Sequence, residues 1–491
     1  MSEANPTHPG SATDDLSRRD FFSRTSDGVF GAGLAYLLAG DFLRPPQLSA
    51  ATAVRTHDLT ERAPHFNPRA RAVIQLFMTG GPSQVDLLDP KPVLKQHAGE
   101  LPRAFLDNVE SVGMAGGLLP SPFKFRNCGD SGIPFSEILP HTSRHADDIA
   151  VVRSMWTTVF NHGPAVFRMH TGQTTPVNPT MGAWVAYGLG TANQNLPAYV
   201  ALDDPQKEVI CGIRNWQSGW LPPVYQGTRL RSIGSPLVNL HAKNEFPAPV
   251  LEVSRELLRR LNTEHQLQRP GQPDLNARIA SYDLAARMQL SATHALDLNQ
   301  ETSNTRKLYG VDNSTTGPYA RRCLMARRLV ERGVRFVQVF MNCSTSPNPW
   351  DHHGNIKHSL KTSCGETDQP VGALLTDLKQ RGLLDSTLVI WGGEFGRLPI
   401  AQLGGSAGRD HGANGCSIWL AGGGIKGGMT HGATDDFGYH AIKDRVSVHD
   451  FHATVLHLLG IDHQRLVYPH HGLDEKLTGV EPARILEEII A

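Results

Sequence analysis

The sequence TLVIWGGEFGRLPIAQLGGSAGRDHGANGCSIWLAGGGIKGGM, residues Thr387–Met429, contains the clearest indications of fold and chemistry in the chain. Its first five residues are apolar or β-branched and carry no charge, which predicts a buried strand. Two glycines follow, and Glu394 then stands where the carboxyl end of that strand would be. A glycine-rich loop is expected next, with Asp410 and His411 at its end. Residues 417–421 have the pattern of a second buried strand.

These polar residues are candidates for a metal site. In open α/β sheets, ligands bind at the carboxyl ends of the strands, so Glu394 and the Asp410-His411 pair are expected to converge. Carboxylate oxygen and imidazole nitrogen suit a divalent metal ion. The structural alternative is that Glu394 pairs with Arg397 or Arg409 and that His411 caps a loop. The stretch by itself leaves both interpretations open.

A second acid–imidazole cluster lies beyond another predicted strand, 334–341. It contains Asp351, His352 and His353. Two such clusters in equivalent positions favour one well-formed metal site, with the predicted ligands Asp351, His353, Glu394, Asp410 and His411. His162, after the predicted strand 148–155, is a further cleft candidate, as is His352, although a single loop histidine is more often structural.

The first predicted strand, 72–78, ends in a tight glycine turn that contains Ser83, with Asp86 close behind. A hydroxyl in that position can act as a nucleophile or help to hold a phosphate. Equally, Ser83 can cap a helix that begins near residue 84. Ser83 and Asp86 are therefore candidate catalytic residues, and the sequence does not choose between the two roles.

Strand patterns at 72–78, 148–155, 196–202, 334–341, 387–391 and 417–421 alternate with helical ones. This alternation predicts an α/β fold with a doubly wound, mostly parallel sheet and helices on both faces. Amphipathic patterns occupy about 247–333 and lead directly into the strand at 334, so we expect a helical insertion within one domain, 52–491.

Composition excludes several classes of protein. The chain has 491 residues, with 47 Lys and Arg against 47 Asp and Glu, so nothing indicates a nucleic-acid partner. Its six cysteines are scattered without a CxxC pair, which argues against a zinc ribbon or a redox pair. No run of 18 apolar residues occurs, so we expect no integral membrane span.

Residues 1–51 have the pattern of a twin-arginine signal region. Ser17-Arg18-Arg19-Asp20-Phe21-Phe22 precedes an apolar run at 28–40 and small residues at 49–51. The alternative is a disordered basic tail beside an unrelated apolar segment. The order of these features favours export by the twin-arginine pathway to the periplasm or the extracellular space.

Taken together, the motifs SRRDFF, GGPSQVDLLDPKP, ARRLVERGVRFV, WDHHGN, GLLDSTLVIWGGEFGR and GRDHG…LAGGGIKGG resemble the bacterial family called domain of unknown function 1501. That family is grouped with the alkaline phosphatase and sulfatase superfamily. The resemblance implies an alkaline phosphatase-like sheet with metal ligands at its carboxyl edge. It also implies that Ser83 stands at the nucleophile's position, and that Asp351, His353, Glu394 and His411 match metal-binding positions.

The departures from that pattern matter for the reaction. No acid precedes Ser83 at the end of the first strand, and Phe395 stands where an Asp-His pair would place a histidine. No C/S-x-P-x-R string occurs, which argues against a formylglycine sulfatase.

The resulting hypothesis is an exported hydrolase of small-molecule or polymeric phosphate or related esters. It would depend on zinc, calcium, magnesium or manganese, and Arg397 or Arg409 would bind the substrate anion. The alternative hypothesis is a non-catalytic metal- or ligand-binding envelope protein with the same fold.

Overall fold

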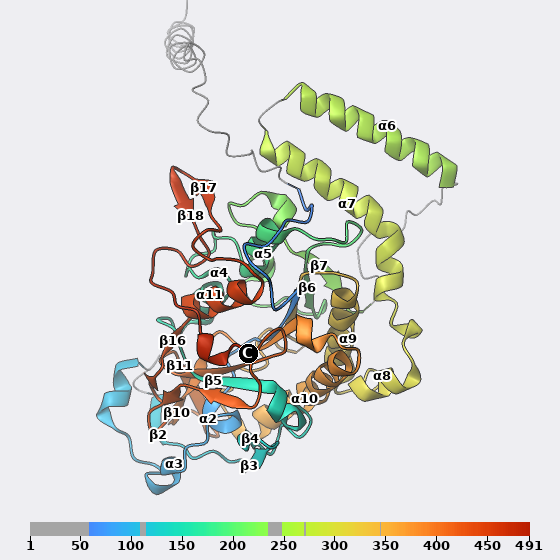
Figure 1. Cartoon of the computed structure of the whole chain (residues 1–491). Helices are drawn as coiled ribbons and strands as arrows, with labels where there is room; N and C mark the ends of the chain where they lie inside the picture. Colours follow the sequence, from blue (N-terminus) through green and yellow to red (C-terminus); the bar gives the residue numbers. More distant parts are fainter. Residues whose placement is uncertain (1–57, 109–113, 234–247, 270–271, 344) are drawn as a thin grey trace, which may run out of the picture. The chain divides into compact units, whose positions relative to one another are not determined.

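A computed structural model describes residues 58–108, 114–233, 248–269, 272–343 and 345–491 (Figure 1). The predicted signal region, 1–51, and the start of the predicted helical insertion at 247 lie outside the described residues. No helix in the described ranges is both long enough and apolar enough to cross a membrane.

The core of the fold is a nine-stranded sheet in which β1 (Ala72–Met78) is central. All seven residues of β1 are buried, as expected of a parallel strand covered on both faces. β1 pairs in parallel with β8 (Phe336–Met341) and β9 (Thr387–Gly392). On the β8 side the parallel order continues through β6 (Tyr199–Asp203) and β7 (Thr228–Arg231).

Beyond β9 the sheet contains its antiparallel strand, β12 (Cys416–Ala421). β12 also pairs antiparallel with β5 (Ile149–Trp156), so β5 runs in the same direction as β1. Two short strands pair in parallel with β5, namely β13 (Met429–His431) and β16 (Val446–Ser447). The sheet is therefore mostly parallel, as predicted.

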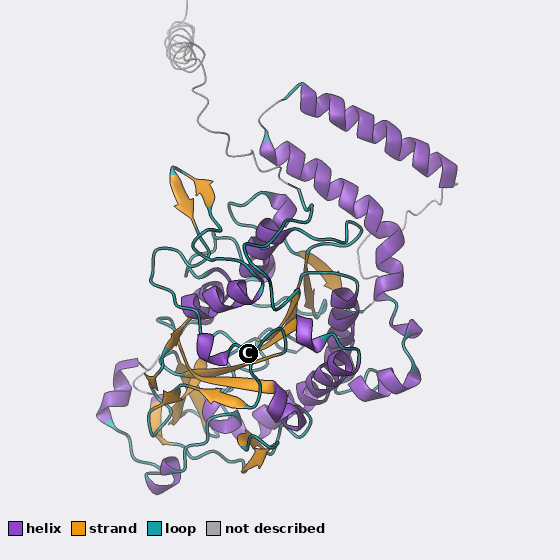
Figure 2. Cartoon of the chain, in the orientation of Figure 1, coloured by secondary structure: helices purple, strands orange, loops and turns teal. Residues whose placement is uncertain are grey.

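Helices cover both faces of the sheet (Figure 2). On one face, Ile74 and Leu76 of β1 pack with apolar side chains of α9 (Gly317–Glu331) and α10 (Ile356–Gln380). On the other, Val73 and Phe77 pack with α4 (His162–Thr171), α5 (Met181–Leu189) and α11 (Val448–Leu458). The two-residue alternation of a strand sends its side chains to both layers, and the predicted doubly wound fold is confirmed.

The stretch between β9 and β12 differs from the prediction. A glycine-rich loop was expected there, but the chain forms a hairpin of β10 (Gly396–Gln402) and β11 (Gly408–Gly412), which β2 (Ala115–Leu118) extends. The hairpin register places Arg397 opposite His411. The glycines at 404 and 405 supply the turn, with φ of +117° and +159°.

The helical segment before β8 contains α6 (Ala248–Leu267), α7 (Pro273–Leu296), α8 (Ser303–Tyr309) and α9. The remaining elements are short. They are α2 (Gln84–Leu87), α3 (Val93–Gln96), the hairpins β3 (Phe125–Cys128) with β4 (Ile133–Ser136), β14 (Ala433–Thr434) with β15 (Ala441–Lys443) and β17 (Tyr468–His470) with β18 (Leu473–Glu475), and the 3₁₀ turns η1 (Arg103–Asn108), η3 (Thr142–Asp148), η4 (Gly212–Trp216), η5 (Pro223–Tyr225), η6 (Leu298–Gln300), η7 (Leu384–Ser386) and η8 (Glu487–Ile489).

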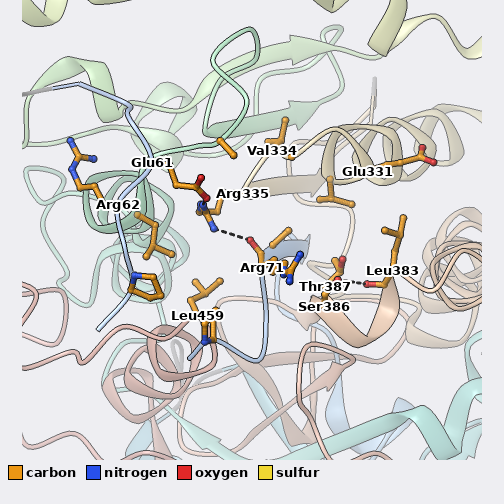
Figure 3. Close-up of a pocket in the computed structure, with 17 residues that line it drawn as sticks. Glu61, Arg62, Arg71, Glu331, Val334, Arg335, Leu383, Ser386, Thr387 and Leu459 are labelled. Atoms are coloured by element: carbon orange, nitrogen blue, oxygen red, sulfur yellow. Dashed lines mark hydrogen bonds and ion pairs between the residues drawn. The ribbon is translucent and has the colours of Figure 1, made fainter. Parts of the chain in front are cut away.

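A cavity of about 440 Å³ lies at the amino-terminal ends of the central strands (Figure 3). Ala72 and Thr387, the first residues of β1 and β9, line it. The Arg335 guanidinium donates to the Arg71 carbonyl across it at 3.3 Å and to Glu61 at 3.0 Å. None of the predicted site residues lines this cavity. The candidate site lies instead where the same strands end.

Candidate metal centre

Four side chains from separate parts of the chain converge beyond the carboxyl ends of the central strands. His162 is the first residue of α4, Asp351 and His353 lie in the turn after β8, and His411 lies in β11. One donor atom from each lies within 4.8 Å of the others. Among the described residues, this is the only group of three or more histidine, cysteine or acidic side chains whose donor atoms could hold one metal ion.

The Asp351 carboxylate is at the centre of the group. Its Oδ1 lies 2.8 Å from His353 Nε2 and 3.3 Å from His411 Nε2. Its Oδ2 lies 3.2 Å from His162 Nε2. The two imidazole nitrogens of His353 and His411 are 3.0 Å apart. These separations are small enough for one cation to contact Asp351, His353 and His411, since metal–ligand bonds to nitrogen and oxygen are about 2.0–2.2 Å long.

Hydrogen bonds on the far side of two rings orient them toward Asp351. Glu394 accepts from His162 Nδ1 at 2.6 Å and from the Gly80 amide at 3.0 Å, and it is buried. His353 Nδ1 is hydrogen-bonded to Gln402 Oε1. With the proton on Nδ1, each ring directs its Nε2 lone pair toward the carboxylate. His162 Nε2 is buried and makes no hydrogen bond of good geometry.

This donor set fits a divalent cation. A carboxylate and several imidazole lone pairs that face one another repel unless a proton or a cation lies between them. Without a cation, protons take this place. Burial lowers the pKa of His162, but Asp351 and Glu394 outweigh it and raise the pKa to about 9. Burial likewise opposes ionisation of Asp351, yet the His162, His353 and His411 imidazoles that face it hold its pKa well below the usual range.

Arg397 anchors the carboxylate from behind. Its guanidinium donates to Asp351 Oδ1 at 2.6 Å, to the Gly81 carbonyl at 2.9 Å and to the Gly80 carbonyl. The Arg397 side chain is fully buried. It therefore ties the turn after β1 to the turn after β8, and it cannot bind a substrate anion as predicted without leaving these partners.

Ser83, Asp86 and Arg409 form a neighbouring buried network instead of facing the cluster. Ser83 Oγ donates to Asp86 Oδ2 at 2.6 Å, and Arg409 binds both Asp86 oxygens at 2.7 and 3.1 Å. All three side chains are excluded from solvent. Because the buried Asp86 charge requires Arg409 as its counter-ion, neither Asp86 nor Arg409 is available to a substrate. The predicted roles of Ser83 as nucleophile and Arg409 as anion clamp are not supported by this arrangement.

Three other predicted residues, Glu394, Asp410 and His352, lie outside the group of four donors. Glu394 contributes no donor atom to the cluster and orients His162, which replaces it among the four. Asp410 Oδ1 accepts from the His411 amide at 2.8 Å and lies 4.0 Å from His353 Nδ1. His352 points into the core, where its Nε2 is 3.0 Å from Ser363 Oγ, and burial lowers its pKa to about 4.

Two features of the site had weak or no signals in the sequence. His162 was recognisable only as a polar residue after a strand, within Asn161-His162-Gly163. Gln402 lies on β10, a strand that the sequence pattern did not predict, so nothing marked it as the partner of His353.

Phe395 packs against the rings of His162 and His411, with centroids 5.0 and 4.7 Å apart. It occupies this side of the cluster with an apolar ring, which fits a single metal site.

The fold and this cluster define an α/β protein with a candidate metal centre at the carboxyl edge of a mostly parallel sheet. The chain belongs to the family described as "Protein of unknown function (DUF1501)", whose model matches residues 70–490. No curated protein matches it.

Solved structures similar to this chain include a lipoteichoic acid synthase, a sulfatase and an alkaline phosphatase. The lipoteichoic acid synthase LtaP from Listeria monocytogenes is 11% identical, with a TM-score of 0.37 over 85% of this chain and 76% of that one. The PsFucS1 sulfatase from Pseudoalteromonas sp. is 12% identical, with a TM-score of 0.35 over 82% and 68%. The alkaline phosphatase from the Antarctic bacterium TAB5 is 11% identical, with a TM-score of 0.30 over 74% and 95%. Likenesses this distant carry no argument about the reaction.

Proposed function

We propose that this protein is an exported, metal-dependent hydrolase of phosphate or related esters. The observation that supports the proposal is the convergence of three imidazoles and one carboxylate on a point that solvent can reach. Asp351 and His353 keep 24% and 32% of their side-chain surface exposed. A catalytic metal site needs a position for water or substrate, and the exposed side of Asp351 and His353 leaves room for one beside the four donors.

The donor set narrows the choice of metal. Imidazole nitrogen is a ligand for zinc and other first-row transition metals, whereas calcium and magnesium prefer sites made of oxygen atoms. Three histidines and one aspartate therefore favour zinc, with manganese as the second choice among the four metals considered. A divalent cation held there would polarise an ester oxygen and lower the pKa of a water molecule.

The residues of this chain would have distinct tasks in such a reaction. Asp351 and the three histidines would hold the cation. Glu394 fixes the His162 ring, and Arg397 fixes the Asp351 carboxylate. Burial lowers the pKa of His411, which keeps that imidazole neutral and able to ligate. With Ser83 buried on Asp86, the attacking group would be water.

Paired variants test the proposal. Asp351→Asn should lose bound metal and reduce hydrolysis of a phosphomonoester and phosphodiester panel by at least about 100-fold, since it removes the central ligand. Ser83→Ala should keep both properties within about fivefold if water is the nucleophile. Metal content by mass spectrometry and initial rates are the measurements. Loss of activity in Ser83→Ala with metal retained would restore Ser83 as the nucleophile.

One observation favours the alternative, a metal-binding envelope protein without turnover. Arg397 and Arg409, the two arginines proposed as anion-binding groups, are buried and engaged with protein carboxylates. Neither is available to neutralise a phosphate. Tight metal binding that Asp351→Asn abolishes, with no hydrolysis of any ester in the panel, would support this alternative.

Export is also a proposal, supported by the order of motifs in residues 17–51. Changing Arg18 and Arg19 together to Lys should leave unprocessed precursor in the cytoplasm, because the twin-arginine pathway reads the arginine pair itself. Fractionation of cells followed by immunoblotting measures the distribution. Normal export of the double variant would show that residues 17–22 are not the signal.

A further inference from the structure

Helix α6 is amphipathic, and its apolar side faces solvent. Val250, Val253, Leu257 and Leu261 recur at helical spacing, so they form one stripe. Their exposed fractions are 47, 70, 57 and 54%. Apolar stripes of helices in water-soluble proteins normally pack against a neighbour. We call these four side chains the α6 stripe.

The polar side of α6 is the one that lies toward the rest of the chain. Arg255, Asn262 and Gln266 are partly buried, and they project from the side of the helix opposite the stripe. Gln266 donates to Asn276 Oδ1 of α7 at 3.1 Å. Figure 1 shows α6 alongside α7. The α6 stripe is therefore directed away from α7, and within the described residues it is left without an apolar partner.

We infer that the α6 stripe is the interface with a second copy of this chain, formed by antiparallel packing of α6 on α6. The charges on the helix favour this occupant. α6 carries three glutamates, at 252, 256 and 264, and three arginines, at 255, 259 and 260. A helix that binds a membrane surface has an excess of basic residues, whereas α6 is balanced.

The stripe and one ion pair beside it fit a two-fold axis near Leu257. Glu256 and Arg260 lie on the same flank of the stripe and pair within one helix at 3.0 Å, whereas Glu252, Arg255 and Arg259 lie on the side away from it. In an antiparallel pair, Glu256 of one copy lies near Arg260 of the other. Val253 and Leu261 are both four residues from Leu257, so Val253 of one copy meets Leu261 of the other across the axis. A surface that is complementary to itself in this way is what a two-fold dimer requires.

The size of the interface sets its strength. The stripe from Val250 to Leu261 is about 17 Å long at 1.5 Å per residue. A single helix pair of this length buries less than the roughly 1,600 Å² of a standard stable interface. The dimer is therefore a reversible one, which forms as the concentration of the chain rises.

Sedimentation velocity of the purified full-length chain over a broad concentration range tests the inference. The wild-type chain should pass from one to two copies. Leu257→Asp should weaken the dimer at least about tenfold without lowering the melting temperature, because the side chain is exposed in the single copy. Leu473→Asp is the matched control, since Leu473 is 64% exposed in the β17–β18 hairpin. It should leave the dimer unchanged.

A charge swap and a cross-link test the geometry separately. Glu256→Arg should weaken the dimer, and Glu256→Arg combined with Arg260→Glu should restore it. Leu257→Cys should form an intermolecular disulfide under oxidising conditions, whereas Leu473→Cys should not. A chain that stays a single copy at every concentration, or a dimer that Leu257→Asp leaves intact, would overturn the inference. So would Leu257-dependent flotation with phosphatidylglycerol vesicles in the absence of a dimer, which would assign the stripe to a membrane surface.

Discussion

At the scale of single residues, the candidate centre depends on the groups that orient its histidines as much as on the four converging side chains. In His162 and His353, the ring nitrogen that faces Asp351 is directed there by a hydrogen bond on the opposite nitrogen. For His162 that partner is Glu394, which also accepts from the Gly80 amide. Replacing this buried carboxylate by a group that accepts fewer hydrogen bonds would leave a buried donor unsatisfied.

Glu394→Gln should lower metal affinity by about 10–100-fold, with little change in size or packing. The amide has a single acceptor oxygen for two donors, and its NH₂ group would favour the His162 tautomer that carries the proton on Nε2. Metal titration against a competing chelator measures the effect. Glu481→Gln is the control, because Glu481 lies 3.2 Å from His449 Nδ1, outside the cluster. Equal affinities for Glu394→Gln and the wild-type chain would contradict the orienting role.

At the scale of elements, the site depends on how closely two turns approach. The turn after β1 passes over the turn after β8 at Gly80, whose φ of +115° is open to glycine alone among common residues. A Cβ atom at this position would lie 2.4 Å from the Asp351 amide nitrogen. Backbone atoms at that distance cannot move aside as the end of a side chain can, so Asp351 itself would have to shift.

Gly80→Ala should therefore abolish metal binding and lower the free energy of unfolding by more than about 2 kcal/mol. Urea denaturation and metal analysis measure these two effects. Gly382→Ala is the matched control, since Gly382 has φ of +65° and no neighbouring atom within 4 Å of an added Cβ. It should cost about 1–2 kcal/mol from the backbone alone and keep the metal. Metal binding by Gly80→Ala would mean that the turns can separate without disturbing Asp351.

At the scale of the whole molecule, buried neutral histidines link stability to pH. His170 packs between Phe77 and Phe340, and His452 Nε2 donates to the Met169 carbonyl at 2.8 Å. Burial lowers the pKa of each to about 3. His452 lies on α11 and is fully buried where that helix contacts α4.

Because both histidines have a folded pKa below the unfolded value of about 6.5, the unfolded chain binds more protons. Stability is therefore full above about pH 6.5 and falls as the pH drops toward about 3, by up to about 1.4 kcal/mol per pH unit for each histidine. His452→Gln keeps a donor for Met169 and should reduce this slope by one proton. Urea denaturation at several pH values measures it, with the exposed His358→Gln as control. An unchanged slope would show that His452 titrates normally.

Much of the fold and part of the centre could be predicted from local pattern alone. Nearly continuous apolar runs identified the central strands, because a strand covered on both faces is mostly apolar. Asp351, His353 and His411 were recognisable as donors, since acids and histidines just beyond strand ends share one edge of the sheet. These are properties of short segments, and they can be read before any long-range contact is known.

Other assignments depended on which groups meet across the folded chain. Glu394 and His162 are both plausible ligands by residue type, yet packing places the carboxylate behind the ring. Ser83 occupies a nucleophile's position in the sequence but lies on Asp86, whose charge needs Arg409. The amphipathic pattern of α6 is the same whether its apolar side packs inward or, as in this structure, faces solvent. Pairing of this kind is set by desolvation and hydrogen-bond geometry between residues hundreds of positions apart, and no local spacing records it.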